Sequence, residues 1–322
     1  MTDEHADGAT MRAIRFHQYG EPADVLRLED APIPKPGAGH IRVRVHACGL
    51  NPADWALCRG LFATELPRGV GLDVSGTVDA VGEGVSDVQV GDLVLGAADY
   101  SDYESAGLAD HAILRAWTSV PDGLDMVEAA ALPMAIETAY RCIDILGVAA
   151  GQTVLIYGAG TVIGFAAVQM ALLRGARVIA AAGESLAGQL RALGAEVTPY
   201  GDGMVERVLE LCGGVPDLIF DAGPVSGVLP DLVRIVGGDA RRIVTVSNHG
   251  DAADTLGVRN SFSALRYDVL GDFAKLAAEG RFHVPIARTF ALEDWREALT
   301  LSLSGHAHGK LMLLPGGTAA ND

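Results

Sequence analysis

Basic residues are scarce in this chain, and their scarcity limits the partners to expect. The 322 residues include 24 Lys and Arg against 41 Asp and Glu, a formal net charge of −17. Such a surface repels polyanions, so general electrostatic binding of nucleic acid or of an anionic membrane is not expected. The net charge does not exclude a local basic pocket. We expect the partner to be a small-molecule substrate.

Cysteine pairs and long apolar runs are also missing. The four cysteines, Cys48, Cys58, Cys142 and Cys212, form no C-x-x-C pair. Their spacing favours free thiols in a reducing compartment, and we therefore expect a cytoplasmic protein. No apolar run reaches membrane-spanning length, and residues 1–10 are too polar for a signal peptide. We interpret residues 1–10 as a disordered tail.

The most informative stretch is Thr153–Leu173, TVLIYGAGTVIGFAAVQMALL, which combines an apolar strand, a glycine turn and a helix. Glycine has no Cβ, so Gly158 and Gly160 let the backbone turn and approach a ligand closely. The helix that follows presents unpaired N–H groups and a positive dipole end to an anion. A second apolar strand, RVIAAA at 177–182, follows at the interval expected of a βαβ unit. The stretch predicts a nucleotide-phosphate site.

The glycine spacing, however, departs from the usual dinucleotide fingerprint. Gly158, Gly160 and Gly164 follow G-x-G-x-x-x-G, one residue longer than G-x-G-x-x-G. Glycine turns between a strand and a helix also occur without a ligand. The motif alone therefore leaves a purely structural turn as the alternative.

The first third of the chain is rich in short β-patterns. Residues 41–47, IRVRVHA, alternate apolar and polar side chains, and further β-like runs lie at 75–81 and 91–96. Prolines and glycines recur throughout 30–39 and exclude a helix there. These patterns predict that this part of the chain forms a small β-barrel.

Four motifs in this order resemble the medium-chain dehydrogenase/reductase superfamily, and its quinone oxidoreductase-like branch is the most similar. They are CGLNPAD at 48–54, GLDVSGTV at 71–78, VGDLV at 90–94 and ALP at 131–133. The resemblance extends from Met11 to Pro315 and implies an α/β fold with two domains. A GroES-like β-barrel substrate domain would comprise 11–125 and 281–322, and a doubly wound parallel Rossmann domain would comprise 126–280. By resemblance, the protein would form a homodimer.

The resemblance also locates a missing metal site. The positions that hold catalytic zinc in the metal-dependent members are occupied here by Asn51, Leu72 and Met134. Leucine has no donor atom, and asparagine and methionine are poor zinc ligands. The four-cysteine structural zinc lobe is missing too. We therefore expect no metal.

Several residues are candidates for the substrate side. Asn51 can donate to a developing enolate oxygen through its amide, or it can merely cap the turn before Pro52. Tyr140 is either an acid or a packed ring. The residues expected to line the pocket are Asp54, Trp55, Met134 and Glu137. Glu137 could equally be a solvated helix residue. Asp54 is expected to accept hydrogen bonds that hold the local fold, in preference to acting as a base.

The cofactor signals conflict. In NAD-dependent enzymes an acid at the end of the second strand accepts a hydrogen bond from the ribose 2′-hydroxyl, but this chain has Ala182 at that position. Residues 178–190 also contain no Lys or Arg that could bind the 2′-phosphate of NADP. Ser185 and Tyr200 offer hydroxyls, and the relatives in this branch mostly use NADPH, so we choose NADP(H) with NAD(H) as the alternative. The predicted cofactor-binding residues are Gly158, Ala159, Gly160, Thr161, Val162, Gly164, Gly183, Ser185, Tyr200 and Ser247.

Three functions compete at this point. The first is metal-free hydride transfer from NAD(P)H to a small quinone or α,β-unsaturated carbonyl. The second is a pathway-specific enoyl reductase with a larger substrate. The third is a nucleotide-binding protein without turnover, which the irregular glycine spacing and the lack of an obvious proton donor leave open.

Overall fold

The computed structural model describes residues 9–224, 226–248 and 250–316, and the chain forms two compact units. The first unit comprises the described residues up to Met134 and those from Leu270 onward, and the second comprises Ala135–Val269. Helices at 126–131 and 270–278 thus fall in the first unit, although both lie within the segment expected for the Rossmann domain. Of the predicted tail, residues 1–8 lie outside the described part, and Thr10 already begins a strand.

The first unit is the predicted β-barrel. Its main sheet has the order β14-β15-β3-β5-β6-β7, and β3 also pairs with β7, which closes the strands on themselves. A second sheet has the order β2-β1-β4. The elements are β1 (Thr10–Phe16), α1 (Pro22–Val25), β2 (Arg27–Pro32), β3 (Ile41–Gly49), α2 (Pro52–Cys58), β4 (Arg68–Gly69), β5 (Asp73–Val81), β6 (Leu93–Ala98), β7 (His111–Ser119), α3 (Met126–Ala131), α10 (Leu270–Ala278), β14 (Ile286–Ala291), α11 (Trp295–Ser304) and β15 (Lys310–Leu314).

Alternation along β3 explains how the barrel acquires its core. Ile41, Val43 and Val45 are buried in the main apolar cluster, whereas Arg44 and His46, which each follow one of these valines, are exposed. The alternating pattern read from 41–47 is therefore a strand with one face in the core.

The second unit is a doubly wound parallel sheet with the order β10-β9-β8-β11-β12-β13, all neighbours pairing in parallel. Counted along the chain this is the order 3-2-1-4-5-6 of dinucleotide-binding folds, with its switch point between β8 and β11. The elements are α4 (Pro133–Leu146), which begins in the first unit, β8 (Thr153–Tyr157), α5 (Val162–Leu173), β9 (Arg177–Ala181), α6 (Glu184–Leu193), β10 (Glu196–Thr198), α7 (Met204–Cys212), β11 (Leu218–Asp221), α8 (Leu229–Ile235), β12 (Ile243–Thr245), α9 (Asp251–Leu256) and β13 (Arg259–Asn260).

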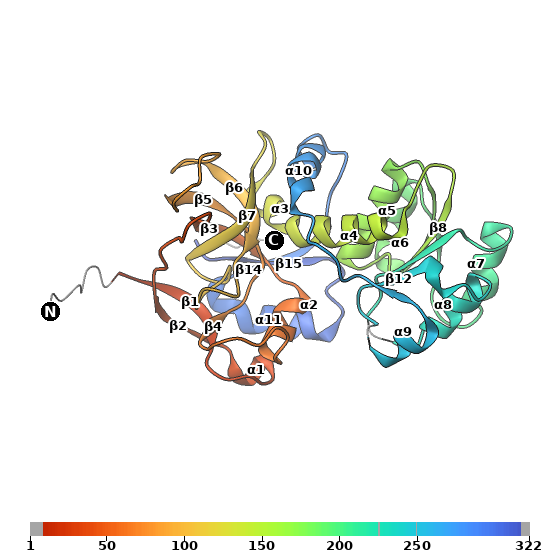
Figure 1. Cartoon of the computed structure of the whole chain (residues 1–322), viewed down its shortest axis with the longest axis horizontal. Helices are drawn as coiled ribbons and strands as arrows, with labels where there is room; N and C mark the ends of the chain where they lie inside the picture. The colour runs from red at the N-terminus through yellow and green to blue at the C-terminus, as the bar shows by residue number, and fades with distance from the viewer. Residues whose placement is uncertain (1–8, 225, 249, 317–322) are drawn as a thin grey trace. The chain divides into compact units, whose positions relative to one another are not determined.

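Helices cover the sheet as this topology requires. Side chains of α7, α8 and α9 share one apolar cluster with Leu155 of β8 and Ile219 of β11, while α5 packs on β8 and β9 (Figure 1). The predicted fold class is confirmed. Among the described residues, no helix has both the length and the apolar character needed to cross a membrane.

Candidate functional site

The glycine turn lies at the switch point, and two of its glycines are required by packing alone. Gly158 has φ of +79°, and a Cβ there would lie 2.3 Å from the Gly223 backbone nitrogen. A Cβ on Gly164 would lie 2.1 Å from the Gly158 oxygen. These two glycines let β8, β11 and α5 approach one another, so they do not by themselves indicate a ligand.

Gly160 is different, because nothing in the fold requires a glycine there. A Cβ at this position would meet only the Ala182 Cβ, at 3.8 Å. The backbone is half-exposed and faces the small residue that follows β9. This is the place where the turn leaves room for a ligand.

Thr161 and Val162 begin the helix that faces this opening. Thr161 is the N-cap of α5, and its hydroxyl oxygen accepts a hydrogen bond from the Gly164 N–H at 3.0 Å. Helix geometry leaves the Val162 N–H free of an intrahelical partner and points it outward with the positive end of the dipole. Ala159 contributes no such group, since its side chain is buried and its N–H donates to the Ala181 oxygen. The anion-binding character thus rests on the helix start.

Beyond β9 and β10 the chain presents two hydroxyls, and the exposed carboxylate of Glu184 lies beside the first of them in the first turn of α6. Gly183 is the N-cap of α6 with open space around it, and Ser185 is exposed. Tyr200 is 37% exposed and makes an edge contact with the Tyr157 ring at 5.2 Å between centroids. The guanidinium of Arg207 donates to the backbone oxygens of 199, 200 and 202, which holds the segment carrying Tyr200 in place. No pattern in the sequence indicates this arginine.

The segments after β11 and β12 are tied together. The Ser247 hydroxyl donates to the Gly223 oxygen. Asp221, at the end of β11, is buried and accepts from Thr245 and Asn248, two residues that the sequence analysis did not select. The next residue in the chain, His249, lies outside the described residues.

Glu137 and Tyr140 on α4 both have partners within the second unit. The Glu137 carboxylate is 3% exposed and accepts from Arg141 Nε at 2.6 Å and from the Arg266 backbone N–H at 3.2 Å. It is therefore neither a solvated helix residue nor an unpaired acid, and it anchors the segment around 266 to α4. The Tyr140 ring lies beneath the guanidinium groups of Arg174 and Arg266, at 5.1 and 4.8 Å. This environment favours the packed ring over the acid.

In the first unit, Asn51 lies in a buried polar cluster. Its side-chain nitrogen donates to Asp73 Oδ2 at 3.0 Å and to the Gly49 oxygen at 3.3 Å. Its side-chain oxygen accepts from Lys310 Nζ at 2.6 Å, and the same ammonium donates to Asp73 Oδ2 at 2.6 Å. Asn51 is 5% exposed and both amide hydrogens are used. The geometry thus favours the turn-and-packing role over that of an oxyanion donor.

The donor set of this cluster does not fit zinc. The two oxygens that could bind a cation, on Asn51 and Asp73, already accept from the Lys310 ammonium. Leu72 is buried, and the backbone N–H of Met134 donates to Asp73 Oδ1 at 2.7 Å. Among the described residues there is no group of three or more His, Cys, Asp or Glu arranged to hold a metal ion. A positive charge at the cluster is supplied by the chain itself.

Trp55 and Asp54 are structural parts of the α2 start. Trp55 is 3% exposed, belongs to the barrel core and donates from Nε1 to Ser302 Oγ at 2.7 Å. The ring packs in the core, and its expected place in the wall of a pocket stays a prediction. Asp54 is fully buried and accepts from the backbone N–H of Asn51 at 2.7 Å and of Gly71 at 3.0 Å. These bonds favour the role of an architectural acceptor over that of a base.

The buried thiols are poor candidates for chemistry. All four cysteines are free, and burial raises the pKa of Cys58 and of Cys142 to about 12. Burial likewise raises the pKa of Cys48 well above its ordinary value. These groups remain thiols at neutral pH, so they offer neither a thiolate nucleophile nor a metal ligand.

Asp54 predicts a pH dependence of stability. Burial raises its pKa to about 7, although hydrogen bonds from the Asn51 and Gly71 N–H groups oppose the rise. Between about pH 4 and 7 the folded state holds a proton that the unfolded state has lost, so the free energy of unfolding falls as the pH rises through this window, by up to about 4 kcal/mol. Urea unfolding at pH 5, 6, 7 and 8 should therefore show a steeper loss in the parent protein than in Asp54→Asn. Equal slopes for the two proteins would mean that Asp54 is ionised in the folded state throughout.

Comparison with known proteins finds two family models along the chain. Residues 37–123 match the family model of the alcohol dehydrogenase GroES-like domain, and residues 193–313 match that of zinc-binding dehydrogenases. The chain is 35% identical to the human quinone oxidoreductase over 181 residues, which are 54% of this chain and 53% of that enzyme. The chain thus spans about half the length of the first curated relatives that it matches.

Two further relatives match over nearly their whole length. A chloroplast envelope quinone oxidoreductase homolog of Arabidopsis thaliana is 27% identical over 96% of this chain and 99% of its own. The structure of the quinone oxidoreductase from Coxiella burnetii superposes with a TM-score of 0.82 and 28% identity, covering 95% of this chain and 99% of that one. The doubly wound sheet and the closed barrel agree with these matches. The chain therefore belongs to the medium-chain dehydrogenase/reductase superfamily, in its quinone oxidoreductase-like branch.

Proposed function

We propose that the protein is an NAD(P)H-dependent oxidoreductase that transfers hydride to a small quinone or an α,β-unsaturated carbonyl without a metal. The observation that carries the proposal is the opening at Gly160, which lies at the carboxyl end of β8 beside the start of α5. In a doubly wound sheet this is where a dinucleotide pyrophosphate lies. The resemblance to quinone oxidoreductases supports the same assignment.

The residues around this opening suggest how a cofactor would be held. The N–H of Val162 would donate to the pyrophosphate, and the open backbone at Gly160 would leave room for it. The hydroxyls of Ser185 and Tyr200 are available to a 2′-phosphate, and no acid stands at Ala182 to hold a free 2′-hydroxyl, so we propose a modest preference for NADP(H). When bound, the nicotinamide supplies the hydride.

The chain offers no obvious proton donor for the reduced substrate. Asn51 has both amide hydrogens in use, and Tyr140 lies beneath two guanidinium groups. We therefore propose that water provides the proton.

Turnover tests the proposal directly. We expect the purified protein to oxidise NADPH in the presence of a member of a panel of small quinones and enones, and to do so more efficiently than with NADH. NADPH binding measured by nicotinamide fluorescence separates the alternatives. Binding without turnover across the panel would indicate the nucleotide-binding protein, and absence of binding would refute the assignment of the site.

Metal content provides a second test. Because the Lys310 ammonium satisfies the two candidate oxygens, we expect no stoichiometric zinc and no change in melting temperature after treatment with a chelator. Elemental analysis and thermal unfolding before and after chelation measure both. Tightly held zinc at one equivalent per chain would contradict the metal-free proposal.

A further inference from the structure

A buried carboxylate lies at the end of β11, on the carboxyl edge of the parallel sheet. Asp221 is fully buried; its Oδ2 accepts from Thr245 Oγ1 at 2.8 Å and from Asn248 Nδ2 at 2.7 Å, and its Oδ1 accepts from the Gly223 N–H at 3.1 Å. A buried carboxylate is costly unless such donors surround it, so these bonds are strongly maintained. Asp221 therefore fixes the start of two segments, one after β11 and one after β12.

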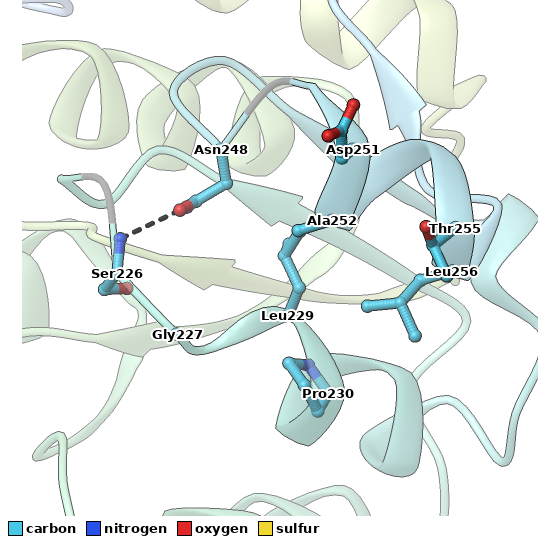
Figure 2. Close-up of a pocket in the computed structure, with 9 residues that line it drawn as sticks. All are labelled: Ser226, Gly227, Leu229, Pro230, Asn248, Asp251, Ala252, Thr255 and Leu256. Carbon is cyan, nitrogen blue, oxygen red and sulfur yellow. Dashed lines mark hydrogen bonds between the residues drawn. The ribbon is translucent and has the colours of Figure 1, made fainter.

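The same carboxylate decides which way the Asn248 amide faces. A carboxylate only accepts hydrogen bonds, so the amide must turn its nitrogen toward Asp221 and its oxygen away. That oxygen accepts from the Ser226 backbone N–H at 2.8 Å, as the dashed line in Figure 2 shows. The three residues form a continuous chain of bonds from β11 through the segment after β12 and back to the segment after β11. We call Asp221, Asn248 and Ser226 the edge latch.

The edge latch also forms one wall of a cavity of about 500 Å³. Ser226 and Asn248 lie on one side of it, and α8 and α9 supply Leu229, Ala252 and Leu256 on the other (Figure 2). An interaction with the Ser226 side chain opposes the rise that burial causes in the pKa of Tyr157 at the end of β8, so the two side chains lie near each other. Ser226 thus stands between the ends of β8 and β12, and its position depends on Asn248.

We propose that the edge latch positions the segments after β11 and β12 for the nicotinamide half of the cofactor. The inference rests on the proposed function. In this strand order the glycine turn and the end of β9 serve the adenosine half, and the strands across the switch point serve the other nucleoside. Asp221 and Asn248 act as positioning residues. They hold the segments in the arrangement that accepts the ligand and make no step of the reaction.

Removing the middle of the latch should weaken dinucleotide binding selectively. In Asn248→Ala, Asp221 keeps its bonds to Thr245 and Gly223, but Ser226 loses its partner. The segment then samples other positions, and the apparent affinity falls with the fraction that remains competent. We expect the Kd for NADPH to rise roughly tenfold, whereas the Kd for 2′,5′-ADP, which carries only the adenosine half, changes less than about threefold.

An exchange of the two side chains provides the rescue. In Asp221→Asn alone, whichever way the new amide turns, a donor faces a donor and one of the bonds to Gly223, Asn248 or Ser226 is lost. In Asp221→Asn combined with Asn248→Asp, the new amide donates to the new carboxylate, which still accepts from Ser226, at unchanged net charge. The double variant should recover most of the NADPH affinity. As a control for lost charge, Asp251→Asn removes an exposed carboxylate from the same cavity without touching the latch, and we expect no more than a twofold effect.

Hydrogen exchange tests the latch without a cofactor. The Ser226 amide should exchange faster in Asn248→Ala than in the parent protein, and the double variant should restore its protection. Equal loss of NADPH and 2′,5′-ADP affinity, or unchanged NADPH affinity in Asn248→Ala, would overturn the positioning role. If the parent protein binds neither ligand, the proposed function fails, and the exchange of Ser226 still decides whether the latch exists.

Discussion

Replacing Gly160 with valine is expected to abolish NADPH binding while leaving the fold intact. A Cβ at this position meets only the Ala182 Cβ at 3.8 Å, and the backbone is not in the left-handed region. The side chain therefore enters the space that we propose for the pyrophosphate and displaces no part of the protein. We expect the Kd for NADPH to rise by about a hundredfold or more, since the loss of close backbone contact and of the helix N-terminus costs about 3 kcal/mol. The melting temperature should change by no more than about 2 °C.

Two matched substitutions make this result interpretable. Gly188→Val places the same side chain on an exposed position of α6 with nothing within 4 Å, and should leave both binding and melting temperature nearly unchanged. Gly158→Ala forces a Cβ against Gly223 at a positive φ and should lower the melting temperature instead. Nicotinamide fluorescence and thermal unfolding measure the two effects separately. Unchanged NADPH affinity in Gly160→Val would refute the proposed cofactor site.

These contrasts show what the sequence can reveal about the glycine turn. The strand, the turn and the helix are local, so the pattern in Thr153–Leu173 predicted all three. The pattern does not separate glycines that packing needs from the one that a ligand needs, because that distinction depends on Gly223 and Ala182 in other parts of the chain. The barrel was predictable for a similar reason: alternation along 41–47 is a local signal.

The polar partners of the candidate residues were mostly beyond the reach of the sequence. Asn51 and Lys310 are 259 residues apart, and no spacing rule connects them. The partner of Glu137 was within reach, because Arg141 follows at the i,i+4 spacing of helical ion pairs. The partner of Trp55 was equally out of reach, because Ser302 lies 247 residues away.

Lys310→Met is expected to destabilise the protein more than any other single substitution considered. Both Lys310 and Asp73 are 1% exposed, and their ion pair at 2.6 Å joins β15 to β5. Removing the ammonium leaves the Asp73 carboxylate buried with only the Asn51 amide and the Met134 N–H as donors. Breaking a buried pair in this way typically costs about 3–5 kcal/mol, because one charge stays uncompensated. Urea unfolding should show this loss.

Two further variants establish that the lost charge pairing, and not the altered volume, causes the effect. Lys275→Met removes an exposed lysine from α10 and should change the free energy of unfolding by less than about 0.5 kcal/mol. Asp73→Asn combined with Lys310→Met neutralises both partners. The new amide at position 73 can still accept from the Met134 N–H, and it can donate to the Asn51 oxygen once the Asn51 amide turns over and gives up its bond to the Gly49 oxygen. We expect the double variant to recover at least half of the loss, since replacing a whole buried pair costs far less than breaking it. A double variant as unstable as Lys310→Met would instead assign the cost to packing around the lysine stem.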